Sequence, residues 1–248
     1  MKTLDKLIKI LCDERGENVP PLSDEQKPDY FRALCNIRPP MPVSAEFLSL
    51  QNEYLTERKN KRGIIDVNSF LYAGGVSLFK GDITSLNADA IVNAANSAML
   101  GCFHPLHNCI DNAIHSAAGV QVRLDCNDIM KGNEAENGKV IVTKAYNLPS
   151  KFIFHTVGPI ANGRVTKRNE QDLENCYLNC LHKADETGLK SIAFCCISTG
   201  VFGYPKEEAA KLAVKTVKNY LAKSGGNLKI IFNVFTEADY EIYKRILK

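Results

Sequence analysis

Hydrophobic residues near the start of the chain recur with the period of an α-helix. The positions i, i+3, i+4 and i+7 are occupied by Leu4, Leu7, Ile8 and Leu11. Charged residues lie between them, which predicts an amphipathic helix rather than a signal peptide. A capping-box sequence at 23–26 predicts a second short helix, and Ser44 is placed to cap a third. Residues 1–63 are few for an independent core, so we expect a helical extension packed on a main domain of residues 64–248.

From residue 64 onward, short apolar stretches alternate with longer helical ones. The expected strands are 64–68, 75–80, 88–93, 139–146, 151–157, 191–198 and 228–234. The expected helices are 106–118, 169–187, 205–223 and 237–247. Short buried strands separated by helices are typical of a three-layer α/β/α domain with a mostly parallel or mixed sheet. The polar stretch 128–138 predicts a loop.

Composition and charge narrow the functional classes. Lys and Arg number 31 against 28 Asp and Glu, and no basic stripe indicates a nucleic-acid partner. No apolar run is long enough to predict a membrane span. The nine cysteines are odd in number, and Cys195 and Cys196 are adjacent in an apolar run. This usage favours free thiols in a reducing, cytoplasmic environment over a disulfide framework.

Two polar motifs follow apolar strands early in the main domain. In Gly81-Asp82-Ile83, the glycine permits a tight turn, and Asp82 can accept from an exocyclic amine. The alternative is that Asp82 only caps backbone N–H groups in an Asx turn. The second motif is Asn93-Ala-Ala-Asn96, whose small residues permit close ligand approach and whose amides suit ribose hydroxyls. Its alternative is plain turn chemistry after a strand.

A third polar segment, 197–205, joins an expected strand to an expected helix. It contains two glycines and two hydroxyl residues, with Pro205 near the first helical turn. Such a segment before a helix start is typical of an anion cradle, in which Phe202 can stack on a sugar or base. The alternative is an ordinary strand-to-helix loop.

These motifs, with Ala-Ile-His-Ser-Ala-Ala-Gly at 113–119 between the second and the third, resemble the macrodomain family. Members of that family bind ADP-ribose. The resemblance covers about residues 74–247 and is specific, because no single motif carries it. It implies a macrodomain fold with a mixed central sheet.

The resemblance also implies roles for individual residues. Asp82 would contact the adenine amine, and Ile83 would line the adenine pocket. Asn96 would hold the distal ribose, with Asn93 supporting it. The diphosphate would be wrapped by Ser198, Thr199, Gly200, Val201, Phe202 and Gly203.

The segment 102–109 departs from the family pattern, because ordinary macrodomains carry a glycine run there. Two thiols and two imidazoles before a helix suit tetrahedral Zn²⁺, and a helix start also lowers a thiol pKa. The candidate ligands are Cys102, His107 and Cys109, which leave a fourth position open, as in catalytic zinc sites. His104 competes for the histidine position or closes the site, and the alternative is buried thiols with incidental histidines. The arrangement, like the N-terminal extension, also resembles the zinc-containing macrodomain subclass of bacteria and some fungi.

Asp111 lies at the expected helix start, where the helix dipole stabilises a carboxylate. It resembles the catalytic aspartate of hydrolytic macrodomains, and His115 either pairs with it or packs in the core. The implied activity is hydrolysis that releases mono-ADP-ribose from a modified protein. Zinc would activate water or orient the distal ribose, and Asp111 would orient or deprotonate the water. An ester to Asp or Glu is the expected bond, because a carboxylate leaves readily.

Two other functions fit the same pocket. One is deacetylation of O-acetyl-ADP-ribose, and the other is a reader module that binds ADP-ribosylated protein without cleaving it. Relatives in the zinc subclass are linked with sirtuin-like ADP-ribosyltransferases and lipoyl-carrier proteins. By resemblance, a modified lipoyl-carrier protein is therefore the candidate partner.

Overall fold

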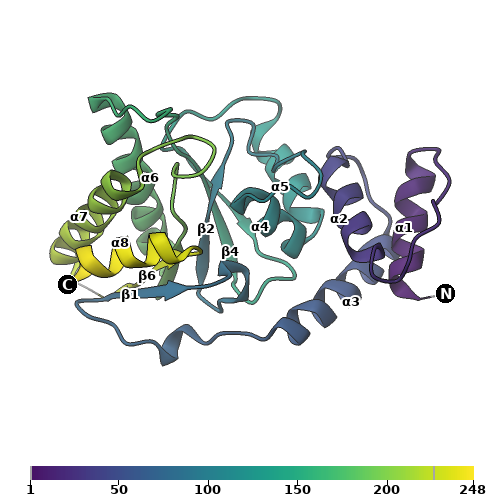
Figure 1. Cartoon of the computed structure of the whole chain (residues 1–248), viewed down its shortest axis with the longest axis horizontal. Helices are drawn as coiled ribbons and strands as arrows, with labels where there is room; N and C mark the ends of the chain where they lie inside the picture. The colour runs from purple at the N-terminus through teal and green to yellow at the C-terminus, as the bar shows by residue number, and fades with distance from the viewer. Residues whose placement is uncertain (1, 226) are drawn as a thin grey trace.

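A computed structural model describes residues 2–225 and 227–248, with a six-stranded sheet at its centre (Figure 1). The strands are β1 (Val76–Lys80), β2 (Ala90–Ala95), β3 (Val140–Lys144), β4 (Phe152–Val157), β5 (Ser191–Phe194) and β6 (Lys229–Val234). Their order across the sheet is β1-β6-β5-β2-β4-β3. Neighbouring strands run parallel except β3 and β4, which are antiparallel, so the predicted mixed sheet is confirmed.

Helices cover both faces of this sheet, as the predicted three-layer architecture requires. One face carries α4 (Ile110–Ala118) and α5 (Gln121–Met130), and the other carries α6 (Lys167–Glu186), α7 (Lys206–Ser224) and α8 (Glu237–Leu247) (Figure 1). Because both faces are covered, the central strands are mostly apolar, and each residue of β5 is buried. None of the helices in residues 2–225 and 227–248 has both the length and the apolar character needed to span a membrane.

Three further helices precede the sheet: α1 (Thr3–Glu14), α2 (Lys27–Ile37) and α3 (Ala45–Arg62). They pack around their own apolar cluster, which includes Leu7, Ile8, Phe31 and Phe47. In Figure 1 they lie beyond α4 and α5, on the side away from α6 to α8. This arrangement supports our proposal that residues 1–63 form an extension packed on a main domain of residues 64–248.

Three element predictions need correction. The strand expected at 64–68 is wrong: Asp66 accepts from the N–H of Asn68 at 3.0 Å and starts a short 3-10 turn, Val67–Ser69. Helix α5 was not expected, because the buried Arg123 interrupts its apolar face, and it extends into the predicted loop. The second helix was expected to open at the capping box of 23–26, but residues 24–26 form a turn and α2 begins at Lys27.

Candidate functional site

The loop between β2 and α4 brings three metal-type donors together. One donor atom each from Cys102, His107 and Cys109 lies within 4.8 Å of the others. The Sγ atom of Cys102 is 3.5 Å from Nδ1 of His107. His104 is exposed and lies outside this group, with its ring centroid 5.8 Å from that of His107. The structure therefore assembles the candidate set with His107 as its histidine.

Burial disfavours the thiolate form of Cys109 in the metal-free protein. Burial, followed by the nearby Cys102 thiol, raises the pKa of Cys109 to about 11. The expected lowering of the pKa by the helix start is present, since the N–H of Asn112 donates to this Sγ at 3.4 Å, but burial outweighs it. Two adjacent, partly buried thiols resist forming two thiolates without a compensating positive charge. This donor chemistry fits Zn²⁺, which binds thiolates and neutral imidazole.

Asp111 stands in the first turn of α4 and is only 5% exposed. Its Oδ1 atom accepts a hydrogen bond of 2.8 Å from the side-chain amide of Asn93 at the end of β2. Burial raises the pKa of Asp111 to about 6, against the opposing effects of Asn93 and Arg123. Nε2 of His115 lies 3.5 Å from Oδ1 of Asp111, but burial holds the pKa of His115 well below its ordinary value. His115 is therefore a neutral packing neighbour.

Behind Asp111 lies a buried network that sequence analysis did not find. The amide of Asn93 also reaches Nδ1 of His155 at 3.1 Å, and Nε2 of His155 is 3.0 Å from the Thr143 hydroxyl. Burial lowers the pKa of His155 to about 3, so the ring is neutral. His115, Cys126 and His155 also offer clustered donor atoms. Because both nitrogens of His155 already have partners, we interpret this cluster as a hydrogen-bonded core rather than a metal site.

The Asp82 carboxylate serves two partners. Its Oδ1 accepts from the N–H of Thr84 at 2.9 Å, as in an Asx turn, and its Oδ2 pairs with Arg62 at 3.1 Å. Ile83 beside it is buried. A cavity of about 250 Å³ opens here between α2, α3 and α4, and the basic side chains of Arg32, Arg58, Lys59 and Arg62 contribute to its lining. The extension therefore forms one wall of a cleft that begins at Asp82.

The Asn96 amide holds the start of the metal-type loop. Its Oδ1 accepts from the N–H of Met99 at 3.1 Å, and its Nδ2 donates to the carbonyl of Gly101 at 3.1 Å. Gly101 has φ +83, and a Cβ there would come within 2.8 Å of the His115 ring. Only glycine permits this close passage of the loop over α4.

The segment 198–203 forms a turn between β5 and α7 with free backbone donors. Among the described residues, the N–H groups of Gly200, Val201 and Phe202 donate to no backbone carbonyl. The facing loop supports the turn, since the N–H of Ala161 donates to the carbonyl of Phe202 at 2.8 Å. Val201 is 77% exposed at the tip. A turn with three free N–H groups is suited to bind phosphate oxygens.

Comparison with known proteins agrees with this architecture. Residues 92–213 match the family model described as Macro domain. A protein named protein-ADP-ribose hydrolase from Staphylococcus aureus strain MRSA252 is 48% identical over 249 residues, covering 97% of this chain and 93% of that protein. The solved structure of the Oceanobacillus iheyensis macrodomain with ADP is 41% identical, with a TM-score of 0.64, over 69% of this chain and 89% of that one.

A second structural match includes the helical extension. The Trypanosoma brucei macrodomain in complex with ADP matches with a TM-score of 0.67 and 27% identity, over 100% of this chain and 97% of that one. The near-complete coverage of the Staphylococcus aureus relative, at 48% identity, shows the family directly. This chain therefore belongs to the macrodomain family.

Proposed function

We propose that this protein is a zinc-dependent hydrolase that releases mono-ADP-ribose from a modified protein side chain. The observation that carries the proposal is the cluster of Cys102, His107 and Cys109 directly before α4, whose first turn presents Asp111. The relative named protein-ADP-ribose hydrolase, which matches 97% of this chain, supports the same activity.

In this proposal the ligand lies across the carboxyl ends of the strands. Asp82 accepts from the adenine amine beside Ile83, and Asn96 faces the distal ribose. The segment 198–203 binds the diphosphate. The free N–H groups at 200–202 support this role. Cys102, His107 and Cys109 would hold zinc, and a bound zinc would supply Lewis acidity at this end of the pocket.

Asp111 is placed to handle the proton. Hydrolysis adds water across the bond between the ribose anomeric carbon and the side-chain oxygen. Asp111 accepts the proton of the attacking water, and the bonding electrons leave with the side-chain carboxylate. In the metal-free protein, burial raises the pKa of Asp111 to about 6, which makes this carboxylate more basic than an exposed one. An ester to Asp or Glu suits this site, because a carboxylate leaves without a general acid.

A further part of the proposal concerns which protein carries the ADP-ribose. A lipoyl-carrier protein modified by a sirtuin-like ADP-ribosyltransferase is the substrate to test first, on the resemblance to the zinc-containing subclass alone. The competing acceptors are other proteins modified on Asp or Glu, and the same release assay separates them by rate.

The experiment pairs metal content with turnover. We expect one zinc per purified chain, and ADP-ribose release from an Asp/Glu-modified protein that a chelator abolishes. Cys102→Ser should lose both zinc and release. Asp111→Asn should keep zinc and ADP-ribose binding but lose release by about 10²–10⁴-fold, as expected when a general base is removed. Release that survives chelation contradicts the role of zinc, whereas binding without release identifies a reader module.

A further inference from the structure

We infer that helix α2 of the extension is part of the metal centre, with Arg32 and Asn36 acting as positioning residues for the loop 100–109. This inference rests on the proposed zinc site and names what holds its ligands in place. Neither residue is a donor in the metal cluster. Both reach the loop from about 70 to 80 positions away in the chain.

Arg32 connects α2 to two of the three candidate ligands. Its Nη2 atom donates to the backbone carbonyl of His107 at 3.3 Å, and also to Oδ1 of Asn112 at 2.6 Å. Asn112 is fully buried and donates its backbone N–H to Sγ of Cys109 at 3.4 Å. Its side-chain amide donates to the carbonyl of His104 at 3.0 Å. One cation on α2 therefore fixes the backbone at His107 and the residue that hydrogen-bonds Cys109.

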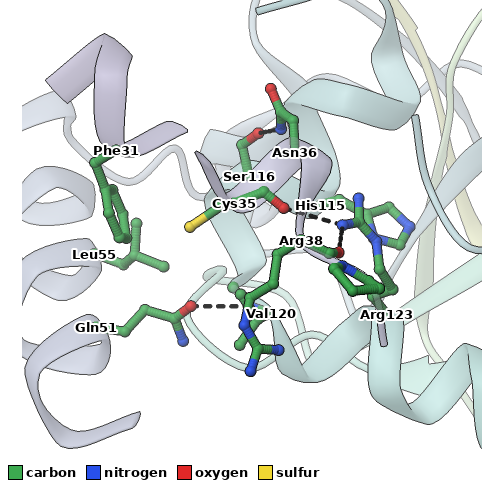
Figure 2. Close-up of a pocket in the computed structure, with 12 residues that line it drawn as sticks. Phe31, Cys35, Asn36, Arg38, Gln51, Leu55, His115, Ser116, Val120 and Arg123 are labelled. Atoms are coloured by element: carbon green, nitrogen blue, oxygen red, sulfur yellow. Dashed lines mark hydrogen bonds between the residues drawn. The ribbon is translucent and has the colours of Figure 1, made fainter. Parts of the chain in front are cut away.

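Asn36, one turn further along α2, holds the loop beside His107. Its Oδ1 atom accepts from the backbone N–H of Leu106 at 3.0 Å, and its Nδ2 donates to the hydroxyl of Ser116 on α4 at 3.0 Å (Figure 2). Leu106 has φ +56, in the left-handed region that is unfavourable for a branched side chain. Such a backbone conformation persists only where its surroundings enforce it, and the buried Asn36 amide does so at the residue before His107.

The start of the loop is attached to the end of α2 through Arg123 of α5. The Nε atom of Arg123 donates to the carbonyl of Leu100 at 2.7 Å. Its Nη1 atom donates to the carbonyls of Cys35, at 3.0 Å, and Arg38 (Figure 2). The Phe103 ring lies over its guanidinium, 4.2 Å from Cζ to the ring centroid. The loop 100–109 is thus attached to α2 at three places. Arg123 connects Leu100 to the end of α2, Asn36 bonds Leu106, and Arg32 bonds His107.

Groups that orient metal ligands contribute strongly to metal affinity, typically 10–100-fold. Without Arg32 or Asn36, the His107 ring and the two thiols would have to be ordered when the metal binds. The expected loss is therefore in metal affinity and site geometry. ADP-ribose binding should be spared, since neither side chain is among those we place on that ligand.

The test uses full-length Arg32→Ala and Asn36→Ala, with Arg58→Ala as the matched control. Arg58 lines the same cavity but makes no hydrogen bond to the loop, its side-chain partner being Tyr54. Zinc affinity is measured by chelator competition, and site geometry by the thiolate and d–d absorption bands of the Co²⁺-substituted protein. We expect a 10–100-fold weaker zinc affinity and altered Co²⁺ bands for the first two variants, with Arg58→Ala unchanged. ADP-ribose affinity, by calorimetry, should stay within about twofold.

The outcomes separate this inference from the proposed function. Wild-type protein that takes up neither zinc nor Co²⁺ overturns the zinc site itself. If the wild type binds metal but Arg32→Ala and Asn36→Ala keep the same zinc affinity and Co²⁺ bands, only the role of α2 is overturned. If Arg32→Ala does not fold, Arg32→Lys is tested instead, because lysine keeps the positive charge but cannot make the paired guanidinium contacts to His107 and Asn112. Unchanged metal affinity in Arg32→Lys and Asn36→Ala then also overturns the inference.

Discussion

Asn93 donates a hydrogen bond of 2.8 Å from its side-chain amide to Oδ1 of Asp111. This bond joins the carboxyl end of β2 to the first turn of α4. The second N–H of the same amide lies 3.1 Å from Nδ1 of His155, so one fully buried amide orients the carboxylate and the imidazole together. Among the described residues, Asn93 donates the one side-chain hydrogen bond to the Asp111 carboxylate, so we expect Asn93 to orient it.

We therefore predict that Asn93→Ala lowers kcat by about 10²-fold, the effect of misplacing a reacting group by roughly 1 Å. KM should change little, because the fully buried Asn93 side chain exposes no surface for a ligand to contact. Single-turnover release of ADP-ribose measures this directly, and Asn68→Ala, a change at an exposed asparagine, is the control. An unchanged kcat would show that Asp111 does not depend on Asn93.

The buried His155 predicts acid sensitivity of the metal-free protein. Its pKa is depressed to about 3, so below pH 6.5 the unfolded chain binds a proton that the folded chain does not. The free energy of unfolding is therefore highest above pH 6.5 and falls as the pH decreases toward 3, by up to about 1.4 kcal/mol per pH unit. The groups in contact with the ring are Asn93, Thr143, Cys126 and neutral His115, none of which supplies a compensating negative charge.

Urea unfolding between pH 6.5 and 5, with chelator present, measures this slope while most carboxylates remain ionised. His155→Asn should reduce the slope, because its side chain does not titrate. The remaining slope should combine the contribution of His115, whose pKa is also lowered, with an opposite contribution from Asp111, whose raised pKa of about 6 lies in the same pH window. Equal slopes for the variant and the wild type would contradict the prediction.

Arg62 and the adenine amine compete for one oxygen of Asp82 in our proposal. The ion pair of 3.1 Å is partly exposed and contributes at most about 1 kcal/mol. We predict that Arg62→Ala tightens ADP-ribose binding by up to about fivefold, since 1 kcal/mol corresponds to that ratio. Calorimetry measures the change against Lys61→Ala as control, since Lys61 is exposed and lies outside the lining of this cavity. Weaker binding would mean instead that Arg62 contacts the ligand itself.

Charge at the tip of the 198–203 turn should govern diphosphate binding. Val201 is 77% exposed, so Val201→Asp and Val201→Asn should leave stability unchanged. We predict that the Asp variant binds ADP-ribose more weakly by up to about tenfold, since like charges about 4 Å apart repel by roughly 1 kcal/mol in water and more close to a protein surface. The Asn variant, of equal size, should bind like the wild type. Equal affinities for Asp and Asn would place the diphosphate elsewhere.

Local signals predicted most of the main domain. The apolar runs that become β2 and β4 are short, buried and bounded by polar residues, and the amphipathic spacing identified α6 to α8. The candidate metal ligands could also be identified from the sequence, because Cys102, His107 and Cys109 lie within one eight-residue segment. The missed elements lack such a signal: Arg123 interrupts the apolar face of α5, and Asp66 turns an apolar run into a 3-10 turn.

Sequence alone therefore determined the alternation of strands and helices, the three ligand motifs and the cluster of thiols and imidazoles, because hydrophobic period and residue chemistry are local properties. Only the tertiary structure decided that His107 and not His104 joins the cluster, that burial outweighs the helix start at Cys109, and that His155 supports Asp111 through Asn93. It also placed Arg32, 80 residues earlier in the chain, against Asn112. These relationships depend on desolvation and on contacts between distant segments, neither of which leaves a periodic trace in a single sequence.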